Sequence, residues 1–371
     1  MTPAATLAPM DVAGRARRLR AGFEEAGCDA LLVTHLVNIR YLSGFTGSAG
    51  VLVVTPGELA LVTDGRYRDQ AAHQLAAAGV EASVVMAQTT SQRREALAAA
   101  VGGAGRLGLE AAHVSWSAQR RYAGEWFAGA TLVPTEGLVE GLRQRKDTGE
   151  LDRLAAAAAI ADAALASVRH RLGEEPTEAQ FALELDSEVR RLGADGASFE
   201  TIVASGPNGA RPHARPGSRT VTEGDLVVVD FGALVDGYHS DMTRTIMVGE
   251  PSPTQRRMLE VVAASQAAGV AAVAAGTAAS AVDRACRSVI DDAGWLDAFL
   301  HGTGHGVGLD IHEDPRVAST STAILGDGHV VTVEPGVYLA EHGGVRIEDS
   351  VVVTATGSDL LTHAPKDPYL S

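Results

Sequence analysis

In the first 143 residues, segments whose apolar residues recur at helical spacing alternate with short runs of apolar residues. Apolar residues at helical spacing predict amphipathic helices, and apolar runs bounded by Gly, Pro and Asp predict strands. The helices are expected over 12–27, 66–78 and 91–101, and the strands over 29–35, 81–87 and 106–114, with a hairpin over 51–64 turning at Pro56-Gly57. This alternation predicts an α/β domain with a mixed sheet.

The pattern changes at "LRQRKDTGEL" (142–151), a polar stretch that leads into a long Ala-rich helix. We place a domain boundary here, with domains over 1–143 and 144–371. In the second domain helices are expected over about 147–172, 177–193, 253–275 and 278–293, and strands around 199–204, 225–248, 329–339 and 345–354. Helices and strands are grouped rather than alternating, which predicts an α+β domain with an antiparallel sheet covered by helices.

One apolar stretch, residues 261–282, carries no charge over a length that could span a membrane. It consists mostly of Ala, Gly, Ser, Thr and Gln, without Leu, Ile or Phe. We therefore expect a helix of a soluble protein, interrupted near Gly276-Thr277, and no membrane partner.

Composition and charge narrow the class of protein. The chain has 371 residues, of which 46% are hydrophobic and 21% charged, with 31 basic and 46 acidic residues giving a net charge of −15. This balance argues against nucleic-acid and anionic-membrane partners, which need a basic surface. The N-terminus lacks the features of a signal peptide. Two cysteines, Cys28 and Cys286, favour a reducing, cytoplasmic location and are expected to be small buried residues rather than nucleophiles.

Acidic residues interrupt apolar strands at several places. In "VVVDFGALVDGYHSDMTRT" (227–245), Asp236-Gly237 predicts a hairpin turn in which paired positions sum to 473. Asp230 then faces Thr243, and Asp241 lies diagonally from Asp230 on the same face, about 7–8 Å away. Two carboxylates in such positions repel each other unless a cation lies between them.

Further acids and histidines occur in three later segments. "HGTGHGVGLDIHEDPR" (301–316) contains His301, His305 and His312, while Glu334 and Glu348 stand in otherwise apolar strands. Any one of these acids alone is explained by an ordinary salt bridge. Four carboxylates with an imidazole instead balance two divalent cations, about 3.5–4 Å apart. Such oxygen-rich ligands suit Mn²⁺, Co²⁺, Fe²⁺ or Zn²⁺.

These residues resemble the pita-bread metallopeptidases, the superfamily of methionine aminopeptidase, prolidase and aminopeptidase P. The ligand order of that superfamily matches Asp230, Asp241, His305, Glu334 and Glu348, and the spacings of 11, 29 and 14 residues agree for 230–241, 305–334 and 334–348. Residues 198–216 are similar to the Xaa-Pro peptidases, and 38–50 with 63–67 to the creatinase/prolidase N-terminal domain. The resemblance therefore spans nearly the whole chain.

The resemblance implies a dinuclear peptidase that hydrolyses the Xaa-Pro bond of short proline-containing peptides, in dipeptides or at a peptide N-terminus, by a metal-bridging hydroxide. It implies two ions, Mn²⁺ before Co²⁺, Zn²⁺ or Fe²⁺, and a homodimer. Asp230 would bind one ion in bidentate fashion, His305 and Glu334 would hold the other, and Asp241 and Glu348 would bridge both.

Other residues receive roles by the same resemblance. Glu334 would also shuttle the proton, His213 and His312 would stabilise the oxyanion or hold substrate, and Tyr338 and Arg346 would support the ligands. Arg316 is either a clamp for a substrate carboxylate or a surface salt-bridge partner. His301 is expected to be structural, and His239 receives no role.

Several alternatives remain at this point. Methionine aminopeptidases lack the N-terminal domain, and creatinases lack the metal ligands. A non-catalytic pita-bread module that binds peptide or protein is the alternative of a different class, although such modules typically lose ligands. A Ser-His-Asp hydrolase has no G-x-S-x-G motif to support it. Dipeptidase and aminopeptidase share every motif above, so the sequence leaves that choice open.

Overall fold

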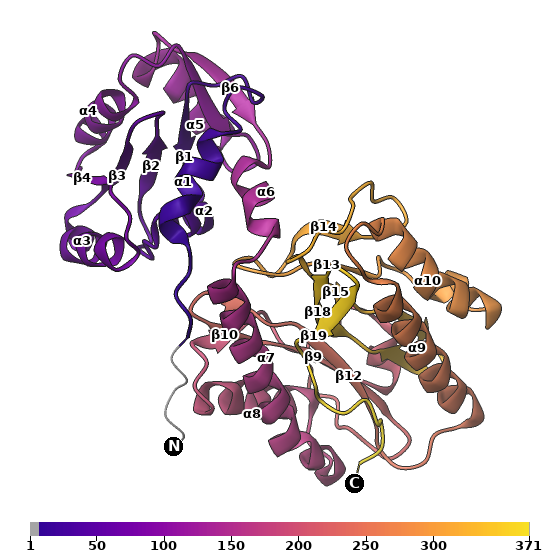
Figure 1. The fold of residues 1–371 in the computed structure, drawn as a ribbon. Coiled ribbons are helices and arrows are strands. Elements are labelled where there is room, and N and C mark those ends of the chain that lie inside the picture. Colours follow the sequence, from indigo (N-terminus) through magenta and orange to yellow (C-terminus); the bar gives the residue numbers. More distant parts are fainter. Residues whose placement is uncertain (1–6, 371) are drawn as a thin grey trace. The chain divides into compact units, whose positions relative to one another are not determined.

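The computed structural model describes residues 7–370, which form two compact units (Figure 1). One unit contains residues 9–143. The other contains residues 7–8 together with 144–370. Each unit has hydrophobic core clusters of its own.

The N-terminal unit is built on a six-stranded sheet in the order β4-β3-β2-β1-β5-β6. Its strands are β1 (Ala30–Val33), β2 (Val51–Val54), β3 (Leu59–Thr63), β4 (Ser83–Met86), β5 (Arg106–Glu110) and β6 (Thr131–Thr135). Its helices are α1 (Val12–Arg20), α2 (Leu36–Ser43), α3 (Arg68–Ala77), α4 (Thr90–Val101), α5 (Trp116–Arg121) and α6 (Leu138–Gln144). Strands β1, β2 and β3 pair antiparallel, and the outer pairs are parallel. The predicted mixed sheet is confirmed.

Some elements of this unit differ from the sequence-based expectation. The helix expected over 12–27 ends at Arg20, because the amides of Gly22 and Phe23 bond three residues back and tighten the chain into turns. The strand expected over 106–114 ends at Glu110. Beyond it the amides of His113 and Val114 donate to the Glu110 carbonyl, so the chain turns out of the sheet. The pattern did not predict α2, α5, β6 or α6.

The second unit packs four helices around short antiparallel sheets. The helices are α7 (Thr148–Val168), α8 (Glu178–Arg191), α9 (Pro253–Ala272) and α10 (Ala279–Asp292). The strands are β7 (Gly196–Ala197), β8 (Ile202–Ser205), β9 (Leu226–Phe231), β10 (Ala233–Val235), β11 (Tyr238–His239), β12 (Met242–Met247), β13 (Gly304–Gly306), β14 (Glu313–Val317), β15 (Val330–Val333), β16 (Gly336–Leu339), β17 (Gly343–Arg346), β18 (Asp349–Thr354) and β19 (Gly357–Leu360). Apolar residues of α7 and α8 pack on β9 and β12, while those of α9 and α10 pack on β15 to β18. The predicted α+β architecture is confirmed.

Two hairpins form the centre of this unit. In the first, Asp230 pairs with Thr243 and Val235 with Tyr238, which confirms the predicted register. In the second, Val333 pairs with Asp349 and Gly336 with Arg346.

Both hairpins are interrupted midway, so the expected long strands split. The first breaks at Gly232 and at Ser240-Asp241, and the second at Glu334-Pro335 and Ile347-Glu348. Pro335 has no N–H to offer the ladder. The amide of Glu348 donates across to Thr243 of the first hairpin.

The uncharged stretch at 261–282 is divided between two helices. Helix α9 ends at Ala272, and α10 begins at Ala279 after Gly276, whose φ of +86° is the left-handed conformation that glycine adopts readily. No helix within residues 7–370 is long and apolar enough to cross a membrane.

Candidate active site and metal centre

A cavity of about 410 Å³ lies in the second unit where the two hairpins break. Its polar lining comes from both hairpins, from the glycine-rich segment 301–316 and from the loop before β9: Asp230, Asp241, Glu334, Arg346 and Glu348, then His301, His305, His312 and Arg316, and finally His213. Its apolar lining includes Phe199, Ile202, Pro212, Ile311 and Ala318. All five sequence-predicted metal ligands therefore lie around one cavity.

The first hairpin supplies two carboxylates. Asp230 belongs to β9, and Asp241 immediately precedes β12. Between them the two strands approach so closely that a Cβ on Gly232 would lie 1.9 Å from the carbonyl oxygen of Ser240. Only glycine fits at this position, and the approach brings Asp241 to the same site as Asp230.

The second hairpin supplies Glu334 and Glu348, which stand opposite each other at its break. The amide of Glu334 donates to the Thr303 carbonyl at 2.7 Å, and its Oε1 accepts from Thr332 Oγ1 at 3.1 Å. Oε2 of Glu348 accepts from Thr243 Oγ1 at 2.7 Å. The Glu334 carboxylate is thus held from its own strand and the Glu348 carboxylate from the first hairpin.

His305 lies on β13 between two glycines that permit close backbone contact. A Cβ on Gly304 would lie 2.0 Å from the Thr332 carbonyl oxygen. Nδ1 of His305 contacts the Gly306 carbonyl at 3.0 Å and must carry the proton, because a carbonyl only accepts. Because burial also lowers the pKa of this imidazole to about 3, the ring is neutral and Nε2 carries no proton. Nε2 faces Asp241 Oδ2 at 3.5 Å and Glu334 Oε1 at 3.4 Å.

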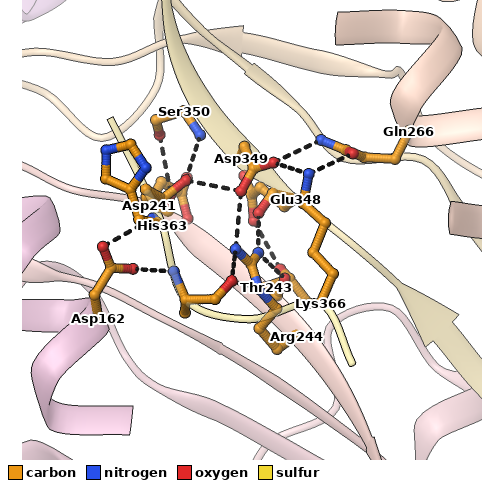
Figure 2. Close-up of polar contacts among 12 residues, drawn as sticks. Asp162, Asp241, Thr243, Arg244, Gln266, Glu348, Asp349, Ser350, His363 and Lys366 are labelled. Carbon is orange, nitrogen blue, oxygen red and sulfur yellow. Dashed lines mark hydrogen bonds and ion pairs between the residues drawn. The ribbon is translucent and has the colours of Figure 1, made fainter. Parts of the chain in front are cut away.

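A buried polar network supports the two bridging candidates from behind (Figure 2). Arg244 donates to the Glu348 carbonyl at 2.5 Å and to Asp349 Oδ1 at 2.9 Å. Lys366 pairs with Asp349 Oδ2 at 2.5 Å, and Ser350 Oγ donates to the Asp241 carbonyl at 2.9 Å. The main chain at Asp241 and Glu348 is therefore held by groups that lie outside the cavity.

Burial and mutual repulsion govern the protonation of the acids. Burial, followed by the charges of Glu348, Asp230 and Glu334, raises the pKa of Asp241 well above its usual range. Burial likewise raises the pKa of Glu334 to about 7 and that of Glu348 well above its usual range. Burial lowers the pKa of His305 to about 3, so the imidazole is neutral. The side chains of this site carry too little positive charge to neutralise all four carboxylates.

We call the four carboxylates of Asp230, Asp241, Glu334 and Glu348 the acid cluster. One cationic side chain, Arg346, lies within it and is 3% exposed. It donates to Asp230 Oδ2 at 2.6 Å, to the Tyr338 hydroxyl at 2.8 Å and to Thr243 Oγ1 at 3.1 Å. Two buried carboxylate oxygens, Asp230 Oδ1 and Glu348 Oε1, have no hydrogen-bond partner among residues 7–370.

The donor set fits divalent cations. One atom each of Asp241, His305 and Glu348 lie within 4.8 Å of one another. Buried carboxylate oxygens without a partner are unfavourable in the absence of a cation, and carboxylate oxygens with an imidazole nitrogen are ligands that divalent cations bind.

The remaining predicted site residues divide into two groups. His213, His312 and Arg316 line the cavity, and the rings of His312 and His305 meet edge to face at 4.4 Å. Burial, followed by the charge of Arg316, lowers the pKa of His312. Tyr338 lies behind the cavity, where its hydroxyl bonds Arg346 and His301, and burial raises its pKa to about 12.

Family comparison decides the class of this site. The model of metallopeptidase family M24 matches residues 152–355, and that of the creatinase/prolidase N-terminal domain matches residues 15–145. The chain belongs to metallopeptidase family M24. Membership implies divalent metal ions, and it makes this M24 chain a hydrolase of peptide bonds.

Relatives of known class cover nearly the whole M24 chain. It is 32% identical to the Xaa-Pro dipeptidase of Pyrococcus furiosus over 353 residues, covering 95% of this chain and 99% of the relative. Among solved structures, the Xaa-Pro dipeptidase of Bacillus anthracis is 38% identical with a TM-score of 0.92, covering 96% of this chain and 99% of that one. The X-Pro aminopeptidase of Thermotoga maritima is 31% identical with a TM-score of 0.86, covering 95% and 99%.

Sequence reasoning missed several residues of this M24 site. His301, which was expected to be structural, lines the cavity, and its Nε2 lies 2.8 Å from the Tyr338 hydroxyl. Thr243 and Arg244 were not singled out, although Asp230 was predicted to face Thr243. The signal for Arg244 was available, since an arginine inside an apolar strand needs buried partners. His239, left without a role, bonds Ser198 Oγ at 2.9 Å.

Proposed function

We propose that this M24 peptidase hydrolyses the Xaa-Pro bond of short proline-containing peptides with two divalent cations, of which Mn²⁺ is the expected one. Residues 1–143 would form the N-terminal domain and 144–371 the catalytic domain of a homodimer. The observation that supports this function is the convergence of four carboxylates and one neutral imidazole on a cavity with a single buried cationic side chain. The names of the relatives support the proline specificity.

The ligands proposed for the cations are Asp230, Asp241, His305, Glu334 and Glu348. Asp230 would help to hold one ion, His305 and Glu334 the other, and Asp241 and Glu348 would contribute to holding both. When bound, such a pair acts as a Lewis acid that polarises the scissile carbonyl and lowers the pKa of water.

Proton transfer is assigned to Glu334. Its carboxyl lines the cavity, and Thr332 orients it through the hydrogen bond to Oε1. In the proposed reaction Glu334 accepts a proton from the attacking water, whose oxygen bonds to the carbonyl carbon before proline. Glu334 then delivers the proton to the proline nitrogen as the C–N bond breaks.

Substrate contacts are assigned to the remaining cavity residues. His213 and His312 would donate hydrogen bonds to the developing oxyanion. Arg316 is exposed on β14, lines the cavity and forms no ion pair among residues 7–370, which favours a clamp for a substrate carboxylate over a surface salt bridge. Because proline nitrogen carries no hydrogen in a peptide bond, this arrangement needs no N–H donor from the substrate.

Chelation tests the metal-dependent mechanism. Protein dialysed exhaustively against chelator should lose hydrolysis of Gly-Pro, and added Mn²⁺ or Co²⁺ should restore it, with two ions bound per chain. Activity that persists in the chelated protein would disprove the proposed mechanism. The variant Asp241→Asn serves as a matched comparison, because it should bind less metal and remain inactive after Mn²⁺ is added.

Paired substrates test specificity. Gly-Pro and the tripeptide Ala-Pro-Pro separate a dipeptidase from an aminopeptidase, since only the latter should cleave the longer peptide efficiently. Gly-Leu and Ala-Leu-Pro, which lack proline after the scissile carbonyl, are the controls. Equal rates on Gly-Pro and Gly-Leu would contradict the proposed proline specificity while leaving the peptidase assignment intact.

A further inference from the structure

A second cluster of metal-binding side chains lies in the N-terminal unit, in residues that the proposed function does not use. One ligand atom each of His35, His113 and Glu140 lie within 4.8 Å of one another. The two imidazole rings stack at 3.8 Å between centroids with 7° between their planes. His113 Nε2 lies 3.1 Å from Glu140 Oε1.

Buried polar groups fix the positions of these three side chains. His35 precedes α2, and its amide donates to Glu110 Oε2 at 2.9 Å, while the amide of His113 donates to the Glu110 carbonyl at 3.0 Å. Asn38 Nδ2 donates to Glu140 Oε1 at 2.6 Å and to Glu110 Oε1 at 2.7 Å. Glu110 and Asn38 thus join the three segments at the end of β5.

The hydrogen bonds of Glu140 suit a ligand. Asn38 Nδ2 donates to its Oε1 at 2.6 Å and orients the carboxylate, as hydrogen bonds commonly orient carboxylates that bind metals.

We propose that His35, His113 and Glu140 bind one divalent cation that prefers imidazole, such as Zn²⁺, Ni²⁺ or Cu²⁺. Two nitrogens and one carboxylate distinguish this set from the oxygen-rich set of the active site, and nitrogen ligands favour these later transition metals over Mn²⁺. Two imidazoles and one carboxylate also form a known zinc ligand set, with water completing the tetrahedron.

Zinc binding requires the two histidine rings to leave their stacked arrangement, because an imidazole nitrogen binds a metal in the plane of its ring and two nearly parallel rings cannot both do so for one ion. Ligand atoms at about 2.0–2.1 Å from a tetrahedral ion are separated from one another by roughly 3.3 Å. His113 Nε2 and Glu140 Oε1 are already 3.1 Å apart. One ligand atom of each of the three side chains lies within 4.8 Å of the others, and rotation of the half-buried His35 ring out of the stack would direct its nitrogen at the same ion.

Bound metal would crosslink three separate segments of the N-terminal unit. His35 stands between β1 and α2, His113 follows β5, and Glu140 lies on α6. An ion held by all three fixes α2 and α6 to the end of the sheet, and it stabilises the folded unit in proportion to the logarithm of its concentration above the Kd.

Zinc content tests this site in the whole protein. Protein first saturated with Mn²⁺ is exposed to a threefold molar amount of Zn²⁺, freed of unbound metal by gel filtration and analysed by mass spectrometry of its metals. The same treatment is applied to His113→Phe, which keeps an aromatic ring against His35, and to Glu140→Gln, which keeps an oxygen for Asn38. His73→Ala removes an exposed histidine from α3 of the same unit and is the matched control.

Wild type and His73→Ala should each retain one more zinc ion per chain than His113→Phe and Glu140→Gln, and anomalous scattering at the zinc edge should show a peak among the three side chains. Equal zinc in all four proteins, or crystals without that peak, would overturn the proposal and leave the cluster as a hydrogen-bonded His-Glu pair with a stacked histidine. Circular dichroism of the variants separates loss of a ligand from loss of folding. Because the comparison reads only the difference between variants, displacement of Mn²⁺ from the active site does not affect it.

Discussion

Arg244 and Arg346 are both almost completely buried, but they hold the acid cluster in different ways. Arg346 pairs with the side chain of Asp230 inside the cavity. Arg244 lies outside it and donates to the main-chain carbonyls of Thr243 and Glu348. Its guanidinium therefore positions the backbone from which a proposed metal ligand projects, without contacting the reacting atoms.

Replacing Arg244 by methionine should destabilise the protein and weaken metal binding. The change leaves the buried Asp349 with Lys366 as its remaining cationic partner, and breaking a buried pair costs about 3–5 kcal/mol. Urea unfolding measures the stability, and a Mn²⁺ titration of the folded variant measures the affinity. Arg256→Met, at an arginine whose side chain is 51% exposed, should change stability by less than about 0.5 kcal/mol. Unchanged Mn²⁺ affinity in folded Arg244→Met would show that Arg244 does not position the site.

The register of the first hairpin could be predicted from the sequence, whereas the interruptions of the two hairpins could not. Asp236-Gly237 fixed the register of the first hairpin, because turn chemistry and alternation are local properties. The break at Glu348 involves a bond between the two hairpins, from the Glu348 amide to the Thr243 carbonyl, which no local pattern records. The short strands β13 and β14 escaped prediction because they are rich in Gly, Asp and Pro rather than β-branched residues.

Substituting Gly304 by alanine tests the close strand contact that positions His305. The added Cβ would meet the Thr332 carbonyl oxygen at 2.0 Å, so the backbone must shift, which we expect to cost at least about 3 kcal/mol and to reduce metal content. Thermal or urea unfolding and metal analysis of the purified variant measure both effects. Gly141→Ala on α6, where a Cβ would have no neighbour within 4 Å, should be neutral or stabilising by up to about 1 kcal/mol. Similar stability in both variants would contradict the importance of this contact.

At the scale of the whole molecule, the acid cluster makes the stability of the folded protein depend on pH and on bound metal. Four carboxylates gathered in one cavity oppose folding when they are charged and unneutralised, and they favour it when cations neutralise them. The sequence predicted this gathering from the resemblance of separate segments. It could not give the supporting network of Arg244, Asp349 and Lys366, because those groups meet only through tertiary packing.

Stability of the metal-free protein should fall as pH rises from about 5 to 8. The pKa of Glu334 is raised in the folded protein to about 7, and those of Asp241 and Glu348 are raised too, so the folded state binds more protons than the unfolded state over this range. The stability gained from these protons is complete below the unfolded pKa values near 4 and is lost as pH passes the folded values. Denaturant unfolding of chelated protein at a series of pH values measures the slope.

Saturating Mn²⁺ should reverse this slope, because cations bind the deprotonated carboxylates and compete better with protons as pH rises. The variant Asp241→Asn is the matched comparison. Without metal at pH 8 it should be more stable than wild type, since one buried charge is gone, and it should gain less from Mn²⁺. The same pH slope in chelated and Mn²⁺-saturated protein would contradict this account.

The second hairpin tolerates inserted residues at some positions and not at others. Glu334 and Glu348 are 14 positions apart along the chain, but the pairing of β16 with β17 determines how they face each other. Side chains alternate between faces, so a one-residue slip of β17 would turn Arg346 and Glu348 away from the cavity. Extra residues inserted at the tip, 340–342, leave the pairing unchanged. Evolution and protein engineering can therefore lengthen this tip, for a tag or a grafted loop, while the chemistry beneath it stays in register.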